Sequence, residues 1–340
     1  MFACPLQVMD ESAAGLYTPE HACTPDVSNT AAVAALQKLP DNAPPLLINP
    51  AHGIGLLLRT SGSTALPKIV PLLAGALTAN GAALAASLGL CPGDVCLNVM
   101  PLFHIGGISA SLLATAATHG SVLVAPRSDA ATLLDCVSPG KGATGPPPTW
   151  FSAAPTIHLA VLAYAAAAAA GGQAPHLPKH ALRFVRSGAA ALSAADVSRV
   201  ASFWGVPVVT SYSMTEQMPI TSRPLGLPAA EQPDGVGQPV CVSVAVVDEA
   251  TLRPVPFGAA GEVCISGPCV MRGYLDNPSA NSRSFFFIGT QRYFRTGDVG
   301  RLDESGGLTL VGRSKELIKV GGEQVSPPEV EAVLGQHPQV

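Results

Sequence analysis

The sequence predicts an α/β protein in which helix-flanked, mostly parallel sheets are followed by a β-rich, barrel-like subdomain. Short apolar runs alternate with helical segments up to about residue 234, and this alternation is typical of a parallel sheet covered by helices on both faces. After about Gly235 the helical periodicity disappears and strand-like runs follow one another. With 340 residues, 48% apolar and only 12% charged, the chain is long enough for one large interior and part of a second domain.

These patterns divide the chain into four regions. They are an irregular segment, an α/β core, a β-rich subdomain and the truncated start of a small C-terminal α+β domain, at residues 1–50, 51–234, 235–312 and 313–340. The first region carries many Pro, Asp and Ala, and we expect one short helix near 31–39. In the last region Ser326, Pro327 and Glu329 stand where a helix cap, a first helical turn and a capping box belong.

Within the α/β core, apolar runs separated by turn residues predict the individual elements. The expected strands are 56–59, 95–100, 122–125, 183–186 and 206–210, and the expected helices are 77–88, 108–117 and 159–170. The segment 138–148, rich in Gly and Pro, is expected to be a loop. The alanine-rich stretch 159–170 is too short to cross a bilayer, which needs about 20 residues, and it reads as a helix ended by Gly171 and Gly172.

In the β-rich subdomain, strands are expected at 242–247 and 262–266. Residues 301–302 and 308–311 flank a polar run of Asp, Glu, Ser and two Gly, and this arrangement predicts a β-hairpin.

Charge and cysteine content exclude several function classes. The net charge is −4, from 23 acidic and 19 basic residues, so nothing favours nucleic acid or an anionic membrane as a partner. The eight cysteines include no Cys-x-x-Cys pair, and their spacing fits neither a zinc site nor a disulfide framework. The N-terminus lacks a basic segment followed by an apolar run, so no secretory signal is expected. We therefore expect a soluble intracellular protein with reduced thiols.

The loop Thr60-Ser61-Gly62-Ser63-Thr64-Ala65-Leu66-Pro67-Lys68 is the sharpest local feature, expected between a strand and a helix. Its hydroxyls, backbone N–H groups and lysine suit phosphate oxygens, although an ordinary polar loop has the same composition. It is not a Walker A loop, because Pro67 and Ile69 replace the glycine and hydroxyl residue that flank that lysine. The run 140–145 matches G-x-G-x-x-G by letters, but prolines on both sides forbid the required helix.

Several segments, taken in order, resemble motifs of the adenylate-forming superfamily, which includes acyl-CoA synthetases, peptide-synthetase adenylation domains and luciferases. They are the Thr60–Lys68 loop, Pro101-Leu102-Phe103-His104, Arg186-Ser187-Gly188-Ala189-Ala190, Tyr212-Ser213-Met214-Thr215-Glu216, Tyr293-Phe294-Arg295-Thr296-Gly297-Asp298, and Gly312–Lys319 with Gly321-Gly322-Glu323. Each motif is weak alone, but six in the family's order are specific. Stretches such as Pro67–Leu72, Trp150–Ile157 and Glu323–Pro327 look most like the peroxisomal CoA synthetase and oxalate–CoA ligase group.

The resemblance implies a catalytic set and a nucleotide-binding set. The catalytic residues would be Lys68, His104, Thr215, Glu216 and Lys319. The nucleotide-binding residues would be Thr60, Ser61, Gly62, Ser63, Thr64, Lys68, Gly188, Ala189, Ala190, Tyr212, Thr215, Asp298 and Arg313. Glu216 would hold Mg²⁺, and Lys315 would mark the hinge to a second domain.

Each assignment has a plain structural alternative. Tyr212 would stack on adenine, but it also suits an interior aromatic with a bonded hydroxyl. Asp298 would accept hydrogen bonds from ribose hydroxyls, but an Asp after Gly297 also suits a turn. Glu216 can be a solvated carboxylate, and His104 a core histidine.

The implied function is an ATP-dependent acid–thiol ligase that uses ATP, Mg²⁺ and coenzyme A on a small carboxylic acid, with oxalate as the candidate acid, in the cytoplasm or peroxisome. Ala65 and Ile69 replace glycines that are frequent in the family's phosphate loop. The family's C-terminal lysine has no counterpart before Val340, so we expect weak adenylation by this chain alone. A truncated protein that only binds nucleotide or a partner is the main alternative. A peptide-synthetase adenylation domain ranks last, because no acidic residue follows the aromatic motif in 105–110.

Overall fold

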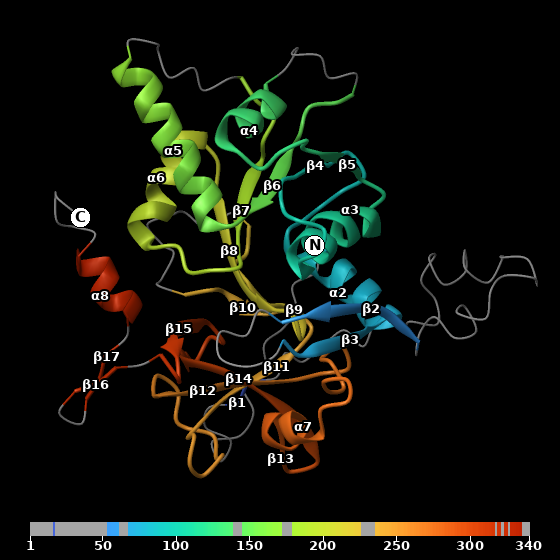
Figure 1. Cartoon of the computed structure of the whole chain (residues 1–340), viewed down its shortest axis with the longest axis vertical. Helices are drawn as coiled ribbons and strands as arrows, with labels where there is room; N and C mark the ends of the chain where they lie inside the picture. The colour runs from blue at the N-terminus through green and yellow to red at the C-terminus, as the bar shows by residue number, and fades with distance from the viewer. Residues whose placement is uncertain are drawn as a thin grey trace, which may run out of the picture.

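The computed structural model describes residues 16–17, 53–60, 67–138, 145–171, 179–225, 235–316, 318–320, 323–325 and 327–334 (Figure 1). The expected helix near 31–39, the G-x-G-x-x-G run up to Thr144, Gly172, Gly321, Gly322 and the expected cap Ser326 lie outside these ranges.

A seven-stranded sheet forms the upper half of the molecule (Figure 1). Its order is β10 (Gln238–Pro239), β9 (Gln217–Ser222), β8 (Val208–Met214), β7 (Phe184–Ser187), β6 (Trp150–Ala153), β4 (Val95–Asn98) and β5 (Ser121–Val124). Strands β8 to β5 pair in parallel, whereas β9 and β10 pair antiparallel. This confirms the predicted mostly parallel sheet. β10 joins it even though this strand follows residue 235, where we expect the β-rich subdomain to begin.

Helices cover both faces of this sheet, as Figure 1 shows. On one face, α4 (Ala130–Val137), α5 (Pro155–Ala170) and α6 (Ala194–Trp204) pack through Leu133, Val161 and Val200 against Phe151 and Val185. On the other face, α2 (Ala74–Ser87), the π-helix η3 (Gly106–Leu113) and α3 (Ala114–Ala117) pack against residues such as Trp150 and Phe184. The side chains of adjacent strand residues thus point to opposite faces of the sheet, as in any pleated strand. Full burial from both sides explains why these strands read as continuous apolar runs.

Sequence signals set several helix boundaries. The Asp129 side chain caps α4 by accepting a hydrogen bond from the Thr132 N–H. The Ser193 side chain caps α6 by accepting a hydrogen bond from the Asp196 N–H. Helix α5 ends before Gly171, as predicted. No helix in the described part of the chain is long and apolar enough to span a membrane.

The segment around Thr60–Lys68 corrects one expectation. It joins two antiparallel strands, β2 (Ile54–Arg59) and β3 (Ile69–Leu73), so it lies in a hairpin and not between a strand and a helix. Helix α2 begins only after β3. Strand β3 is apolar throughout, yet its burial alternates, with Val70 and Leu72 inside and Ile69 exposed. Because all five residues of β3 are apolar, the alternation of buried and exposed positions cannot be recognised in the sequence.

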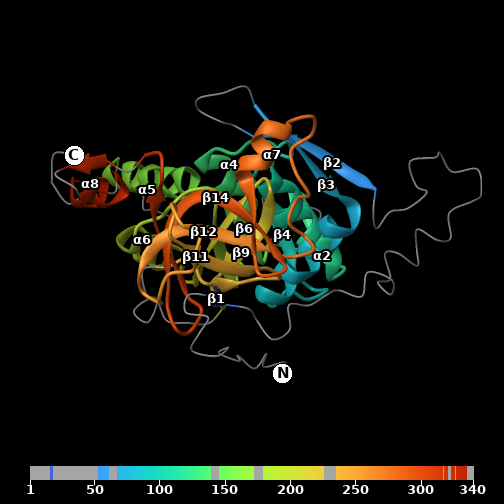
Figure 2. The ribbon, with the colours of Figure 1, turned by 90° about the horizontal axis from the view of Figure 1, so that it is seen from below.

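A second, antiparallel sheet forms the lower half (Figures 1 and 2). It contains β1 (Leu16–Tyr17), β11 (Ser243–Val247), β12 (Ala260–Ser266), β14 (Gln291–Leu302), β13 (Phe285–Ile288) and β15 (Leu308–Arg313). The predicted hairpin is confirmed as β14–β15. A short helix, α7 (Pro278–Ser284), interrupts a region predicted to lack helices, and β1 arises within the segment predicted to be irregular.

One apolar core joins the two halves. Leu58 and Val70 of the β2–β3 hairpin, Tyr212 and Ile220 of β8–β9, and Phe294 of β14 belong to the same buried cluster. Beyond β15, the strands β16 (Ile318–Val320) and β17 (Glu323–Val325) form a small hairpin before α8 (Pro327–Leu334), which starts at the predicted Pro327. None of the six cysteines that the structure describes is in a disulfide.

Candidate nucleotide-binding site

The turn between β8 and β9 places Glu216 against a loop of the second sheet. The residue is only 5% exposed, and its Oε1 accepts a 2.7 Å hydrogen bond from the Tyr274 hydroxyl. Its main-chain carbonyl accepts a hydrogen bond from the Met271 N–H at 3.1 Å. Burial, and then the nearby Glu216 carboxylate, raise the pKa of Tyr274, so this tyrosine stays protonated and donates to Glu216. Glu216 is therefore a fixed, buried carboxylate.

Lys68 reaches the same place from the β2–β3 hairpin. Its Nζ lies 4.4 Å from the centroid of the Tyr274 ring, a cation–π contact. The Leu275 N–H donates to the Ile69 carbonyl at 3.0 Å, which ties the hairpin to this loop. At the base of the hairpin loop, the Thr60 N–H donates to the Lys68 carbonyl at 2.9 Å and the Lys68 N–H donates to Thr60 Oγ1 at 3.2 Å.

Part of the phosphate-loop prediction lies outside the described residues. Ser61, Gly62, Ser63 and Thr64 belong to the undescribed stretch 61–66, so only Thr60 and Lys68 of that loop are placed.

A second group of polar residues forms around Asp298, in the middle of β14. The Tyr212 hydroxyl of β8 donates to Asp298 Oδ2 at 2.5 Å, and Arg313 Nε lies 3.1 Å from Oδ1. Asp298 and Arg313 are register partners across β14–β15. Burial raises the pKa of Asp298, against the opposing effects of the Tyr212 hydrogen bond and the Arg313 charge. Asp298 thus lies in a strand, not in the turn that its neighbour Gly297 suggested.

The two groups meet at one hairpin. Tyr212 and Glu216 are separated by four positions on β8 and its turn, and each binds a residue of the second sheet region. Residues from the β2–β3, β8–β9 and β14–β15 hairpins, far apart in sequence, therefore converge on the boundary between the sheets. Thr215 occupies the same turn and is half-buried.

The Gly188–Ala190 segment follows the carboxyl end of β7, where α/β sheets bind ligands. Gly188 is buried, and a Cβ built there would lie 3.2 Å from Ser211 Oγ and 3.3 Å from Arg186 Nη1, so a side chain would crowd the neighbouring strand. Ala189 is exposed and adopts φ +73°, a left-handed conformation uncommon for alanine. Strain of this kind is typical of functional loops.

In the described part of the chain, His104 and Lys315 make no direct contact with these groups. His104 is exposed in the turn before η3, and its ring lies 4.8 Å from that of Phe103. Lys315 is exposed just after β15. Lys319 lies on β16, opposite Gln324, and its side chain is outside the described part.

The residues present fit a magnesium ion held mainly by phosphate oxygens. In the described part of the chain, no three His, Cys, Asp or Glu residues come together as a metal site. One buried carboxylate, Glu216, with a lysine nearby suits Mg²⁺, which keeps several waters and takes one or two protein carboxylates plus substrate phosphates.

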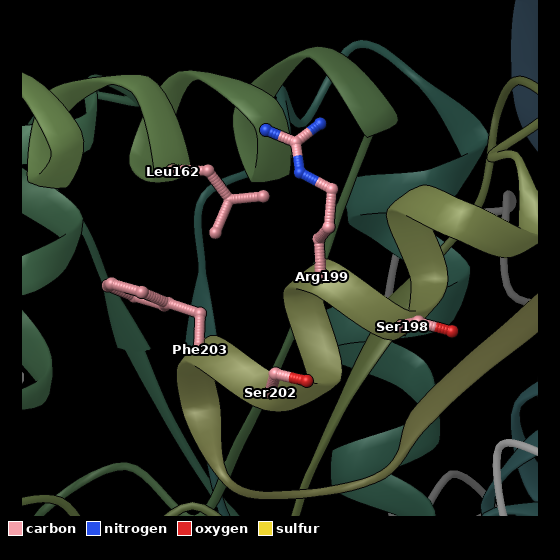
Figure 3. A pocket seen from close by; sticks show the side chains of 5 residues that line it. All are labelled: Leu162, Ser198, Arg199, Ser202 and Phe203. Carbon is pink, nitrogen blue, oxygen red and sulfur yellow. The ribbon is translucent and has the colours of Figure 1, made fainter. Parts of the chain in front are cut away.

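Sequence reasoning missed Tyr274, which links Lys68 to Glu216. No motif marks it, because Gly273-Tyr274-Leu275 reads as an ordinary loop. A separate groove between α5 and α6 is lined by Leu162, Ser198, Arg199, Ser202 and Phe203, and none of the predicted site residues lines it (Figure 3).

The sequence profile of the AMP-binding enzyme family matches residues 10–275. This chain belongs to that family. The match to an AMP-binding enzyme covers β7, the β8–β9 hairpin and the loop with Tyr274, but ends before β14 and Asp298.

The chain is also similar to individual proteins along most of its length. The chain is 38% identical over 316 residues to a probable CoA ligase of Humulus lupulus, covering 89% of this chain and 56% of that protein. It is also 38% identical over 311 residues to an oxalate–CoA ligase of Arabidopsis thaliana, covering 91% and 57%. The crystal structure of ATP-bound MatB from Rhodopseudomonas palustris superposes with a TM-score of 0.73 at 29% identity, covering 85% and 54%. The chain thus spans a little over half the length of these relatives.

Proposed function

We propose that this chain carries the nucleotide site of an acid–thiol ligase, in which a carboxylate attacks the α-phosphate of ATP, pyrophosphate leaves, and the thiol of coenzyme A displaces AMP from the acyl-adenylate. The observation that carries the proposal is the convergence of Lys68, Glu216, Asp298 and Arg313 at the β8–β9 hairpin. Their chemistry matches a magnesium nucleotide: two cations for phosphates, one carboxylate for a metal and one for hydroxyl donors.

The geometry supports a role for each group. Asp298 is held by Tyr212 and Arg313, so its acceptor oxygens keep a fixed orientation toward ribose hydroxyls. Lys68 and Arg313 donate to phosphate oxygens, with the guanidinium offering a fork of donors. Glu216 would hold Mg²⁺, which would offset phosphate charge when bound. Because Tyr212 is buried and its hydroxyl faces Asp298, we assign it first to orienting Asp298, beside the expected contact with adenine.

The acyl substrate is a small carboxylic acid, and the similarity to an oxalate–CoA ligase makes oxalate the first acid to test. His104, exposed at the turn before η3, is placed by this proposal beside the reacting carboxylate, with Thr215 near the phosphates and Lys315 and Lys319 in the hinge.

Calorimetric binding of Mg·ATP to the full chain tests the proposal. We expect Mg·ATP to bind, and Glu216→Gln to lower its affinity at least tenfold in magnesium while leaving metal-free ATP binding nearly unchanged. Glu304→Gln is the matched control, since Glu304 is an exposed carboxylate in the β14–β15 turn. Equal affinity of the wild type and Glu216→Gln for Mg·ATP would remove Glu216 from the site, and no binding at all would overturn the proposal.

A further inference from the structure

Arg186, on β7, is a buried arginine with an incomplete set of partners. It is 1% exposed, and its Nη1 donates to Ser152 Oγ at 2.8 Å. Its Nε and Nη2 are fully buried and have no hydrogen-bond partner. Buried polar groups are nearly always paired, so two free donors on one guanidinium indicate a ligand that the structure does not contain.

Arg183, just before the same strand, shows which kind of group the Nε and Nη2 atoms of an arginine bind together. Its Nε donates to Asp94 Oδ1 at 2.9 Å and its Nη2 donates to Asp94 Oδ2 at 2.6 Å. This edge of the guanidinium matches the two oxygens of a carboxylate. In Arg186 the same edge is free, so the missing partner has the geometry of a carboxylate.

The surroundings of Arg186 leave its charge uncompensated. In the described part of the chain, no carboxylate forms an ion pair with it, and the acidic group that acts on it is the Cys96 thiol. Burial raises the pKa of Cys96 to about 12, so that thiol is neutral at physiological pH. Burial lowers the pKa of Arg186 to about 10, which still leaves it cationic. A buried, unpaired cation attracts an anion strongly.

The position of Arg186 connects it with the candidate site. Nη1 lies 3.3 Å from the position that a Cβ would take on Gly188, at the start of the predicted nucleotide segment. Arg186 shares its face of the sheet with Ser152 and Trp150, the face that packs against η3. There the Trp150 indole N–H is a further buried donor without a partner. On this face of the two strands, the buried unpaired groups are therefore the donors of Trp150 and Arg186. They lie on the side of η3 (Gly106–Leu113), a helix that includes two glycines, two serines and an alanine.

We propose that Arg186 is the specificity-determining residue for a short dicarboxylic acid, binding the second carboxylate through Nε and Nη2 while the first is activated at the nucleotide site. The inference rests on the proposed function and names its substrate class. The carboxylate that is not activated remains an anion throughout the reaction, so Arg186 supplies binding and orientation and takes no part in proton transfer.

Calorimetry on the full chain, with and without Mg and α,β-methylene-ATP, tests this. The ligands are oxalate, malonate and succinate, compared with acetate, propionate and butyrate. We expect at least one dicarboxylate to bind ten times or more tightly than the monocarboxylate of equal length. Arg186→Gln should lower that affinity at least tenfold without changing nucleotide affinity, and Arg186→Lys should retain part of it. Arg199→Gln, which changes an exposed arginine, should bind as the wild type does.

The outcomes separate the two proposals. If the nucleotide binds but dicarboxylates have no advantage, or Arg186→Gln binds them normally, the role of Arg186 is wrong and the nucleotide site stands. If dicarboxylates bind through Arg186 but the nucleotide does not bind, the ligase proposal fails instead. The wild-type preference needs no variant, so its absence overturns the role of Arg186 even if Arg186→Gln does not fold.

Discussion

The hydroxyl of Tyr212 is the contact on which the orientation of Asp298 depends. In Tyr212→Phe the buried Asp298 Oδ2 loses its donor, and an unsatisfied buried acceptor costs about 1–3 kcal/mol. We expect that loss in the free energy of unfolding by urea, together with weaker nucleotide binding. Tyr293→Phe is the matched control, because Tyr293 is as buried but its hydroxyl makes only a 3.4 Å contact with Gln291. Equal losses in the two variants would contradict a special role for the Tyr212–Asp298 bond.

Ala189 allows a test of backbone strain at the nucleotide segment. An L-residue in the left-handed region costs roughly 1–2 kcal/mol, whereas glycine adopts it freely but loses about 0.4–1 kcal/mol of unfolded-state entropy. Ala189→Gly should therefore raise the unfolding free energy by about 0.5–1 kcal/mol. Ala190→Gly, at a position without positive φ, should lower it by a similar amount. Thermal denaturation of the two variants shows whether each substitution stabilises or destabilises the protein. Destabilisation by both would show that Ala189 is unstrained.

His158 gives stability a specific pH dependence. Burial lowers its pKa to about 4, although its Nε2 lies 3.2 Å from the Arg186 carbonyl oxygen, a hydrogen bond that opposes the shift. In the unfolded chain His158 takes up a proton as the pH falls through about 6.5, whereas the buried His158 of the folded chain stays neutral until about pH 4. The contribution of His158 to the free energy of unfolding is therefore fully present above about pH 6.5 and is lost as the pH drops toward 4.

Between about pH 6.5 and pH 4, the free energy of unfolding should fall by up to about 1.4 kcal/mol per pH unit. His158→Gln should flatten the slope in urea denaturation series from pH 4.5 to 7, while His119→Asn, at an exposed turn, should keep it. An unchanged slope in His158→Gln would show that other groups cause the acid sensitivity.

At the scale of elements, an ion pair joins the amino ends of β4 and β7. Asp94 receives two hydrogen bonds from Arg183 and one from Thr149, whose hydroxyl oxygen also accepts from the Val95 N–H. Burial raises the pKa of Asp94, but the hydrogen bonds from Arg183, Thr149 and Cys91 lower it below its usual value. The stabilisation of the folded state by the Asp94–Arg183 pair is therefore present above about pH 4 and is lost in stronger acid. This loss occurs at lower pH than the loss due to His158, which falls between about pH 6.5 and 4.

Arg183→Gln should cost about 2 kcal/mol of unfolding free energy, less than breaking a fully buried pair because Arg183 is partly exposed. Arg199→Gln removes the exposed Arg199–Asp196 pair of α6 and should cost less than about 0.5 kcal/mol. Chemical denaturation at neutral pH measures both, and comparable losses would mean that the Asp94 pair is no stronger than a surface pair.

The fold elements that the sequence predicted are those with strong local signals. Buried strands such as β4 and β7 are short apolar runs between turns, and α5 is a long alanine-rich run that ends at Gly171. Strand β3 and helix α7 were missed for opposite reasons. In β3 the alternation of buried and exposed residues is invisible because both are apolar, and α7 is a polar, short helix whose start is fixed by an Asn277 cap.

At the scale of the whole molecule, bound nucleotide should link the two sheets. Tyr212–Asp298 and Glu216–Tyr274 both cross the boundary between them. We expect Mg·ATP to slow hydrogen exchange in peptides covering 208–222 and 291–313 together, since ordering one side of these contacts restricts the other. Peptides of α5 should exchange at unchanged rates, because α5 packs on the sheet away from these residues. Protection of only one of the two segments would contradict a site shared by both sheets.

Apolar periodicity and short polar motifs are properties of neighbouring residues, so they were enough to predict the fold class, the family resemblance and most residues of the candidate site. It left Asp298 and Tyr212 ambiguous, since each suits a structural role as well. The folded chain was needed to see that these two residues bond to each other, that Tyr274 joins Lys68 to Glu216, and that Arg186 is buried with two free donors. Those facts depend on which strands pair and how deeply they are buried, and long-range pairing leaves no local trace in the order of residues.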